Sequence, residues 1–265
     1  MKQLKAAVIG LGVIGSAQVR LLGPMVRAGY DIKAGPYPRR LVNDCDFAVI
    51  CVGTPRGEGG HADLTAVHAA LGRLPASMPV MIRSTVPPGT MAALEKRHGC
   101  VVHVPEFMSE RPDGVWREPS DVPFLIAGGT PQALEWFQPV LTMIAGGPVY
   151  CCTGLEAEFI KYTANCYLAA KVTFVNEMAR VCEAFGADWE TVREGWLHDP
   201  RAGTTHTATK GHDPGFGGSC LPKDLAALIA ASGDAGYEPR FLEAVQYSNA
   251  LFRASLPENL PVAGG

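Results

Sequence analysis

The sequence predicts an α/β protein in which a doubly wound parallel sheet is followed by a long connecting helix and an all-helical dimerisation domain. Short apolar runs alternate with helical patterns through the first half, as in a parallel sheet covered on both faces. Residues 155–185 then contain no Pro or Gly, and helical patterns dominate the rest of the chain. We therefore expect a sheet domain over residues 1–154 and a helical domain over residues 155–265.

Apolar runs and helical periodicity define the elements of the first half. The expected strands are residues 4–10, 47–52, 80–82, 101–104, 123–127 and 149–151. The expected helices are residues 13–27, 63–74 and 88–97. Pro88 opens the last of these, where its missing N–H removes no helical hydrogen bond.

The long helix dominates the second half. At 1.5 Å per residue, residues 155–185 would extend about 46 Å, which suits a link between two parts of the molecule or two subunits. Gly186 follows as a helix-terminating glycine. Shorter helices are expected at residues 189–197, 221–232 and 240–255, with a loop over residues 199–219.

Composition excludes several classes of protein. The 265 residues are 47% apolar and 18% charged, which argues against disorder. The net charge of −3 leaves no basic surplus for nucleic acid. No apolar run reaches the ~18 residues that span a bilayer, and the first ten residues lack a secretory pattern. We expect a cytoplasmic protein with no nucleic-acid or membrane partner.

The eight cysteines show no Cys-x-x-Cys spacing and no cluster with histidine, so we expect no metal site. Most lie in apolar runs, as small buried side chains do in a reducing compartment.

A glycine pattern, Gly10-Leu-Gly12-Val-Ile-Gly15, follows the first strand and opens the first helix. Gly10 permits a tight turn, Gly12 lets a pyrophosphate approach the backbone, and Gly15 allows close helix–strand packing. The helix N-terminus adds N–H groups and partial positive charge. This favours a Rossmann-like dinucleotide site, and the alternative is a plain tight turn.

An acidic residue about 20 positions further on should bind the adenosine ribose. Counting about 20 positions from Gly15 reaches Gly35, which is not acidic. Asp31 comes before that position and is expected to lie inside a strand. Arg39 and Arg40 follow closely. An arginine there can hold a 2′-phosphate, so NADP is an alternative to NAD; solvated surface arginines and low nucleotide affinity also remain open.

The most informative stretch runs from Gly215 through Phe-Gly-Gly-Ser to Cys220 and ends at Lys223 and Asp224. Cys220 stands at the start of an expected helix, and a helix N-terminus raises the thiolate fraction of a cysteine. Lys223 and Asp224 follow at i+3 and i+4 and can share its face. The alternative is a buried cysteine beside a capping Ser219.

Four polar residues of the long helix fall on one face: Glu158, Lys161, Asn165 and Asn176. An ammonium and an amide among apolar neighbours suit stabilisation of a developing oxyanion. The alternative is a polar face turned to solvent.

These stretches resemble the UDP-glucose/GDP-mannose dehydrogenase family, NAD-dependent enzymes that oxidise a nucleotide sugar at C6 to the acid. The run that ends in Cys220-Leu-Pro-Lys-Asp224 is highly specific. The other matching stretches come in the family's order: residues 10–15, 47–55, 84–90, 105–110, 158–165 and 176–177.

The resemblance implies that Cys220 is the nucleophile of a four-electron oxidation through a thiohemiacetal and a thioester. The other catalytic residues that it implies are Lys161 and Asn165 for the oxyanions, Asp224 with Thr85 for a proton-handling water, and Glu106 for thioester hydrolysis. Two hydride transfers imply two cofactor molecules per product.

The resemblance also implies the binding residues. Those for the cofactor are Gly10, Gly12, Val13, Ile14, Gly15, Val52, Gly53, Thr54, Thr85 and Lys223. Those for the nucleotide-sugar substrate are Glu106, Phe107, Met108, Glu110, Lys161, Asn165, Phe216 and Gly217, with Arg201 reaching across the interface of a homodimer built through the helical domain.

The chain departs from the family in two respects. We expect it to lack the family's third, nucleotide-binding domain. The segment before Phe47 is short, so that the helix and the acidic residue that frame the adenosine are also expected to be missing. We therefore expect a minimal enzyme of this class. The alternatives are a 3-hydroxyacid dehydrogenase, which shares the Lys161–Asn165 pair but needs no thiol, and a dimer that binds sugar nucleotides without turnover.

Overall fold

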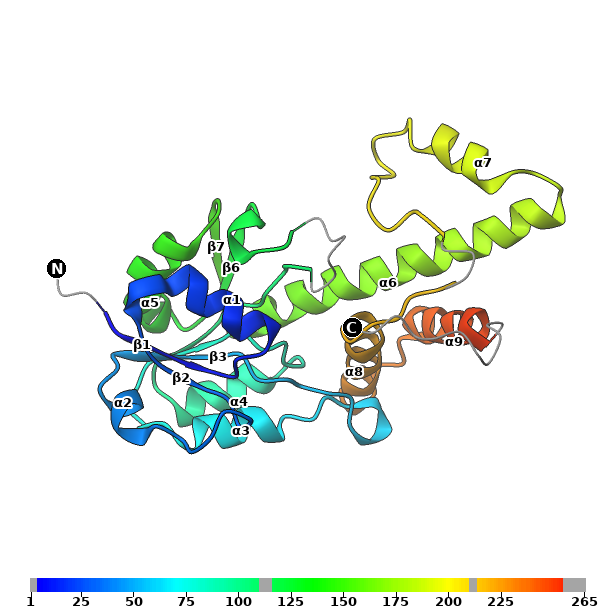
Figure 1. Ribbon diagram of the computed structural model, residues 1–265. Helices are drawn as coiled ribbons and strands as arrows, with labels where there is room; N and C mark the ends of the chain where they lie inside the picture. The colour runs from blue at the N-terminus through cyan, green and yellow to red at the C-terminus, as the bar shows by residue number, and fades with distance from the viewer. Residues whose placement is uncertain (1–3, 110–115, 210–213, 255–265) are drawn as a thin grey trace. The chain divides into compact units, whose positions relative to one another are not determined.

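The structure is a computed structural model that describes residues 4–109, 116–209 and 214–254. The chain forms two compact units. The sheet unit is Met1–Gly57 with Ala62–Lys161, and the helical unit is Glu58–His61 with Tyr162–Gly265. The division falls inside one continuous helix, α6 (Gly154–Ala184), which is followed along its length in Figure 1.

The sheet unit is built on seven strands in the order β2-β1-β3-β4-β5-β6-β7. They are β1 (Ala6–Ile9), β2 (Val26–Tyr30), β3 (Phe47–Ile50), β4 (Val80–Ile82), β5 (Val101–His103), β6 (Leu125–Gly129) and β7 (Val149–Cys152). The chain leaves β1 for β2 and returns past β1 to β3, which makes a switch point between the carboxyl ends of β1 and β3.

The sheet is parallel, as expected, except at one pairing, where β6 runs antiparallel to β5. A parallel return requires a crossover, usually a helix. Between these two strands the described residues form only loop and a short 3-10 helix, Pro119–Asp121. β7 is parallel to β6, so these two strands run against the other five.

The first helix is shorter than the expected residues 13–27. α1 (Val13–Leu22) ends at Gly23, which has a positive φ of 51°, and Pro24 follows in a 3-10 turn. Proline has no N–H to continue the helical hydrogen bonds. β2 therefore begins at Val26 and ends at Tyr30, so the strand expected around Asp31 lies earlier in the chain than the sequence analysis placed it.

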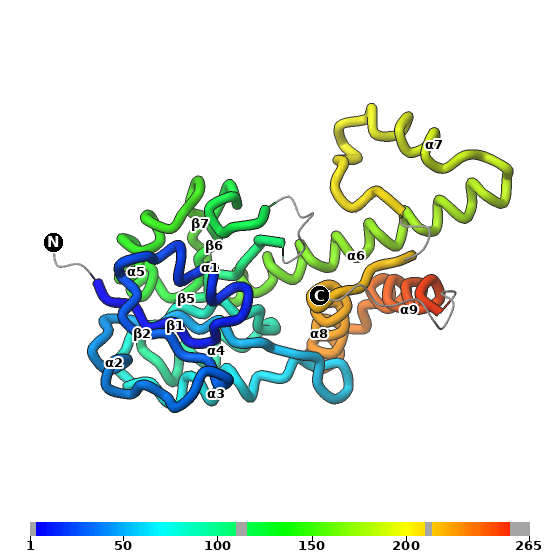
Figure 2. The backbone as a smooth tube through the Cα atoms, viewed as in Figure 1, coloured from blue at the N-terminus to red at the C-terminus, as the bar shows by residue number. Residues whose placement is uncertain are grey.

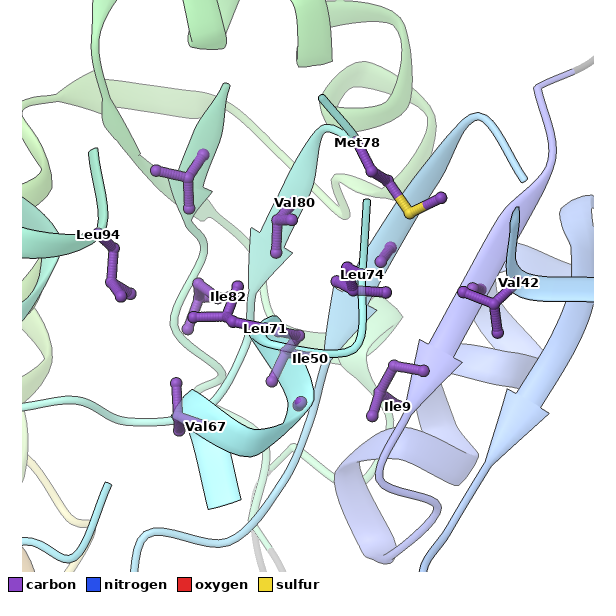
Figure 3. Close-up of a cluster of buried hydrophobic side chains, with 14 of the residues drawn as sticks. Ile9, Val42, Ile50, Val67, Leu71, Leu74, Met78, Val80, Ile82 and Leu94 are labelled. Atoms are coloured by element: carbon purple, nitrogen blue, oxygen red, sulfur yellow. The ribbon is translucent and has the colours of Figure 1, made fainter. Parts of the chain in front are cut away.

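Helices cover both faces of the sheet, as the alternating pattern predicted (Figure 1). One face packs α1 and α5 (Pro131–Ile144) on strand residues such as Val8 and Val49. The other packs α2 (Arg39–Asn43), α3 (Thr65–Leu71) and α4 (Thr90–Arg97). Figure 3 shows this second layer, where Val67 and Leu71 of α3 pack with Ile50 and Ile82.

The helical unit contains most of α6 together with three further helices in its described residues. These are α7 (Trp189–Trp196), α8 (Leu221–Asp234) and α9 (Arg240–Ala254). α8 packs against α9, and the two can be followed in Figure 2. A small core of Cys166, Ala169, Phe216, Leu225 and Val245 joins α6, α8 and α9. As expected, Gly186 with a φ of 75° follows the end of α6.

Candidate active site

The predicted site residues of the sheet unit follow the carboxyl ends of consecutive neighbouring strands. Gly10 follows β1, the segment 52–54 follows β3, Thr85 follows β4 and Glu106 follows β5. The carboxyl ends of parallel strands meet at one edge of a sheet, which is where ligands bind in such folds. The sheet thus gathers segments that lie almost 100 residues apart in sequence.

The glycine loop has space where a pyrophosphate would need it. A Cβ on Gly12, the N-cap of α1, would meet nothing within 4 Å. A Cβ on Gly15 would lie 1.7 Å from the carbonyl oxygen of Gly10, so this position requires close packing. No side chain caps α1, and the unpaired N–H groups of a helix N-terminus favour an anion. Val13 and Ile14 form the first turn.

Asp31 corrects the expectation that the acidic residue is missing. Because β2 ends at Tyr30, Asp31 lies at the carboxyl end of that strand and not inside it. Its Oδ2 accepts the N–H of Leu11, 2.9 Å away and 20 residues earlier, and its Oδ1 accepts the N–H of Lys33. The N–H groups of Lys33 and Leu11 lower the pKa of Asp31, so it is anionic at neutral pH.

An anionic Asp31 suits the two hydroxyls of an adenosine ribose and repels a 2′-phosphate. Arg39 and Arg40, the residues that left NADP open, are exposed on α2. The open space at Gly12, the close packing at Gly15 and the carboxylate of Asp31 together fit NAD.

The loops after β3 and β4 are joined by side-chain hydrogen bonds. Ser84 Oγ donates to the carbonyl oxygen of Val52 at 2.7 Å, and Thr54 Oγ1 donates to that of Thr85 at 2.8 Å. A Cβ on Gly53 would meet nothing within 4 Å, so space remains beside this pair of loops. The segments predicted to bind the cofactor are therefore fixed to each other.

Glu106 is buried in a polar network that the sequence did not reveal. Its Oε1 accepts the N–H groups of Phe107 and Met108, at 2.8 and 3.0 Å. Its Oε2 is paired with Arg83, a side chain that is itself 2% exposed, and accepts Gln18 Nε2 at 3.2 Å. Both carboxylate oxygens are thus held in one orientation.

Lys161, at the end of the sheet unit, is 8% exposed and lies against this network. Its Nζ lies 4.7 Å from the centroid of the Phe107 ring, within the range of a cation–π contact. His103 is buried nearby, and burial lowers its pKa to about 3, so it is neutral at pH 7. Glu110 lies outside the described residues.

The polar face of α6 is not turned to solvent, since Glu158, Lys161, Asn165 and Asn176 are all buried. Its members nevertheless have separate partners. Glu158 accepts the N–H groups of Gly89 and Met91, at 2.7 and 2.6 Å, at the start of α4. It therefore fixes α6 to the loop that carries Thr85.

In the helical unit, Asp224 is the centre of a second buried group. It is 1% exposed. Asn165 Nδ2 donates to its Oδ2 at 2.5 Å, and Lys223 is paired with its Oδ1. Lys223 and Asn165, predicted for cofactor and oxyanion, are thus both joined to the predicted proton-handling carboxylate.

Cys220 is the N-cap of α8 and is partly exposed. Its carbonyl oxygen accepts the N–H of Asp224 at 2.9 Å, which closes the first turn. Ser219 is not the cap, and its Oγ lies 3.5 Å from the Cys220 Sγ. The thiol therefore stands at a helix N-terminus, where backbone dipoles favour negative charge.

The glycine-rich segment before Cys220 is held by two asparagines. Asn176 Oδ1 accepts the N–H of Gly215 at 3.0 Å. Asn249 of α9 binds both the N–H and the carbonyl oxygen of Phe216. Gly217 lies against Arg253.

Arg201, in contrast, is exposed and forms a bidentate pair with Asp199 of its own loop, at 2.6 Å in the shortest contact. Within one chain it is not joined to the other predicted substrate residues that the structure describes.

Sequence reasoning considered Asp31 and set it aside, and it missed Gln18, Arg83 and Asn249. Asp31 was detectable, because Gly23-Pro24 signals an early helix end and moves the strand forward. The other three carried no local signal, since each acts on a residue at least 23 positions away in sequence.

Two features are absent from the described part of the chain. None of its helices is long and apolar enough to cross a membrane. No group of three or more His, Cys, Asp or Glu residues within it is arranged to hold a metal ion.

Two family models match the chain. The NAD binding domain of the UDP-glucose/GDP-mannose dehydrogenase family matches residues 26–113, and its central domain matches residues 155–251, together more than half of the chain. The UDP-glucose 6-dehydrogenase of Pseudomonas aeruginosa is 38% identical over 243 residues, covering 82% of this chain and 51% of that protein. The chain spans about half the length of the curated relatives it matches.

Solved structures agree on the fold. A UDP-glucose dehydrogenase from Pyrobaculum islandicum, 27% identical, matches with a TM-score of 0.77 over 94% of this chain and 68% of that one. The 3-hydroxyisobutyrate dehydrogenase of Mycobacterium tuberculosis, 19% identical, matches with a TM-score of 0.72 over 96% of this chain and 95% of its own. The second likeness shows a shared fold alone.

Proposed function

The chain belongs to the UDP-glucose/GDP-mannose dehydrogenase family, with NAD as the cofactor, and from this we propose that it oxidises the C6 alcohol of a UDP- or GDP-sugar to the uronic acid. The observation that carries the proposal is the partly exposed Cys220 at the N-terminus of α8, preceded by its restrained glycine segment. A dehydrogenase that stops at a ketone or aldehyde needs no such thiol.

NAD, held by the glycine loop, Asp31 and the segment 52–54, supplies the hydride acceptor when bound. The C6 alcohol first loses a hydride from C6 and its hydroxyl proton, which leaves the aldehyde. The thiolate of Cys220 then adds to the aldehyde carbonyl carbon, and a proton completes the thiohemiacetal. Loss of a hydride from that carbon and of the hydroxyl proton leaves a thioester. Water then cleaves the carbon–sulfur bond, which releases the carboxylic acid and returns the thiol.

The surrounding groups stabilise charge and move protons. Lys161 and Asn165 lie at i and i+4 on α6 and hold the oxyanions that form at C6. Asp224, with Thr85, orients the water that takes up and returns protons. Glu106 assists hydrolysis of the thioester, and its contacts with Arg83 and Gln18 hold it in one orientation for that task.

The substrate is held by Phe107, Met108 and Gly217, while Phe216, which is buried in the small core, supports this segment from within. Arg201 reaches the substrate of a second copy in a homodimer, since within one chain it extends into solvent. The dimer forms along α6, where Tyr167, Phe174 and Val181 recur every seven residues and are 40–60% exposed. A seven-residue apolar repeat is the pattern with which helices pair.

Product stoichiometry tests the proposal. The protein is incubated with NAD and a panel of UDP- and GDP-sugars, and reduced cofactor and uronic acid are both quantified. Two reduced cofactors per acid are expected. Cys220→Ser should abolish acid formation while leaving the circular dichroism spectrum unchanged, because a serine hydroxyl at this position is a far weaker nucleophile. Acid made by Cys220→Ser at the parental rate contradicts the proposal.

A second candidate is supported by the fold shared with the 3-hydroxyisobutyrate dehydrogenase, together with the Lys161–Asn165 pair. An enzyme of that class transfers one hydride and uses no thiol. One reduced cofactor per product, with full activity in Cys220→Ser, would favour it.

A further inference from the structure

The amide of Asn249 forms two hydrogen bonds with the backbone of one residue. Its Oδ1 accepts the N–H of Phe216 at 2.7 Å, and its Nδ2 donates to the Phe216 carbonyl oxygen at 3.0 Å. Asn249 is 7% exposed and Phe216 is 4% exposed, so water does not readily replace either contact. The Asn249 side chain thus pairs with the N–H and the carbonyl oxygen of Phe216 as the backbone of a neighbouring strand would.

Gly215 lets the amide come this close. A Cβ at Gly215 would lie 2.4 Å from Asn249 Oδ1, and the φ of 80° already favours glycine. On the other side, Asn176 Oδ1 accepts the Gly215 N–H at 3.0 Å. Two helices, α6 and α9, therefore hold two consecutive peptides of the segment that leads to Cys220.

Cys220 is consequently restrained from both sides. After it, α8 packs into the small core through Leu225. Before it, a φ of 79° at Gly218 makes the backbone turn, and the next fixed point upstream is the pair formed by Asn249 and Phe216. Without that amide, the Phe216 N–H and C=O are buried without partners, which favours a rearranged segment.

We propose that Asn249 is a positioning residue: it holds residues 215–219 in the conformation that presents Gly217 to the substrate and sets the approach to Cys220. This role rests on the proposed function, because the substrate and the nucleophile are taken from it. Asn249 does not itself touch the reacting atoms.

The first test compares Asn249→Ala with Gln246→Ala, a partly exposed amide on the same helix. Alanine favours helix at both positions, so a loss confined to Asn249→Ala does not come from α9 itself. By hydrogen–deuterium exchange, amide protection at Phe216 should fall about tenfold in Asn249→Ala and stay at the parental value in the control. Unchanged protection at Phe216 overturns the proposal.

Kinetics supply the second test. For the nucleotide sugar that the parent uses best, kcat/KM should fall about tenfold in Asn249→Ala, with the KM for NAD within twofold of the parent. Parental kcat/KM in the variant overturns the positioning role. Absence of turnover in the parent overturns the proposed function instead, and the exchange experiment still decides whether Asn249 holds the segment.

Asn249→Asp makes the test specific for the pairing. At pH 8 its carboxylate accepts from the Phe216 N–H but repels the carbonyl oxygen, so that one of the two hydrogen bonds is lost. Its kcat/KM and the amide protection at Phe216 should therefore be lower than those of the parent at pH 8. Parental values of both overturn the pairing.

Discussion

The two glycine-rich segments of the molecule are restrained in different ways. In the first, a Cβ on Gly15 would meet the Gly10 carbonyl oxygen at 1.7 Å, and one on Gly10 would meet the backbone of Cys51 at 2.8 Å. Backbone therefore packs on backbone. In the second, Gly215 lies against the side chain of Asn249 and Gly217 against that of Arg253.

The difference explains why a short glycine motif accounts for the conformation of the first segment. A motif of the same kind does not show what holds the second segment in place. A backbone obstacle is present whatever the neighbouring side chains are, so the glycine pattern alone specifies the first loop. The second loop depends on amides that α6 and α9 supply from 33 to 39 positions away.

Among the variants that test this comparison, Gly15→Ala should have the largest effect on the free energy of unfolding. Its Cβ needs a shift of the Gly10 backbone, and overpacking of this kind should cost about 3 kcal/mol or more of unfolding free energy. Gly12→Ala is the matched control, because its Cβ enters open space. It should keep parental stability yet weaken NAD binding. Urea unfolding and calorimetric titration with NAD separate the two, and equal stabilities of the two variants would contradict the packing argument.

Each glycine segment has a cysteine beside it, and their reactivities should differ by about 100-fold or more. Cys51 is also partly exposed, but desolvation raises the pKa of its thiol to about 12, so it carries almost no thiolate at pH 7.5. Cys220 is partly exposed at a helix N-terminus. In a Cys151→Ser background, which removes the exposed thiol, iodoacetamide should label Cys220 first in peptide mass spectrometry. Equal labelling of Cys51 and Cys220 would be inconsistent with this difference in environment.

Within the sheet unit, too, a side chain holds a backbone segment in place, because Glu158 accepts the N–H groups of Gly89 and Met91. Burial, opposed by the N–H groups of Met91 and Gly89, raises its pKa from 4.5 to about 7. The folded protein therefore binds this proton more tightly than the unfolded chain does. The resulting stabilisation is complete below pH 4.5 and is lost as the pH rises through 7.

Relative to Glu158→Gln, the parent should lose about 3 kcal/mol of unfolding free energy across that range. Urea unfolding at a series of pH values measures the difference. Parallel pH profiles for the parent and Glu158→Gln would show that Glu158 does not titrate in this way.

The smallest effect is expected from a rescue in the second segment. Gly215→Ala should destabilise the protein by about 1–2 kcal/mol, because its Cβ meets Asn249 Oδ1 and its φ is positive. Adding Asn249→Ala removes that obstacle, so the double variant should lose less than the sum of the single losses. Strict additivity would mean that the side chain is not what restricts Gly215.

Much of this arrangement could be predicted from sequence. The apolar runs located six of the seven strands, and Gly186 marked the end of α6. The error at β2 came from extending a helix past Gly23-Pro24, and it also placed Asp31 inside the strand instead of after it. The partners of Glu106 and Phe216 were not predictable, because Arg83 and Asn249 acquire their roles only when distant elements pack together.

Trapping the covalent intermediate would establish the role of Cys220 without relying on a variant's loss of activity. The protein is mixed with NAD and the nucleotide sugar that it oxidises, quenched in acid during turnover, and digested for peptide mass spectrometry. We expect a thioester of the uronic acid on the peptide that carries Cys220, and no adduct in Cys220→Ser. Uronic acid formed at a steady rate, with Cys220 unmodified at every quench time and full activity in Cys220→Ser, would contradict the thiol mechanism.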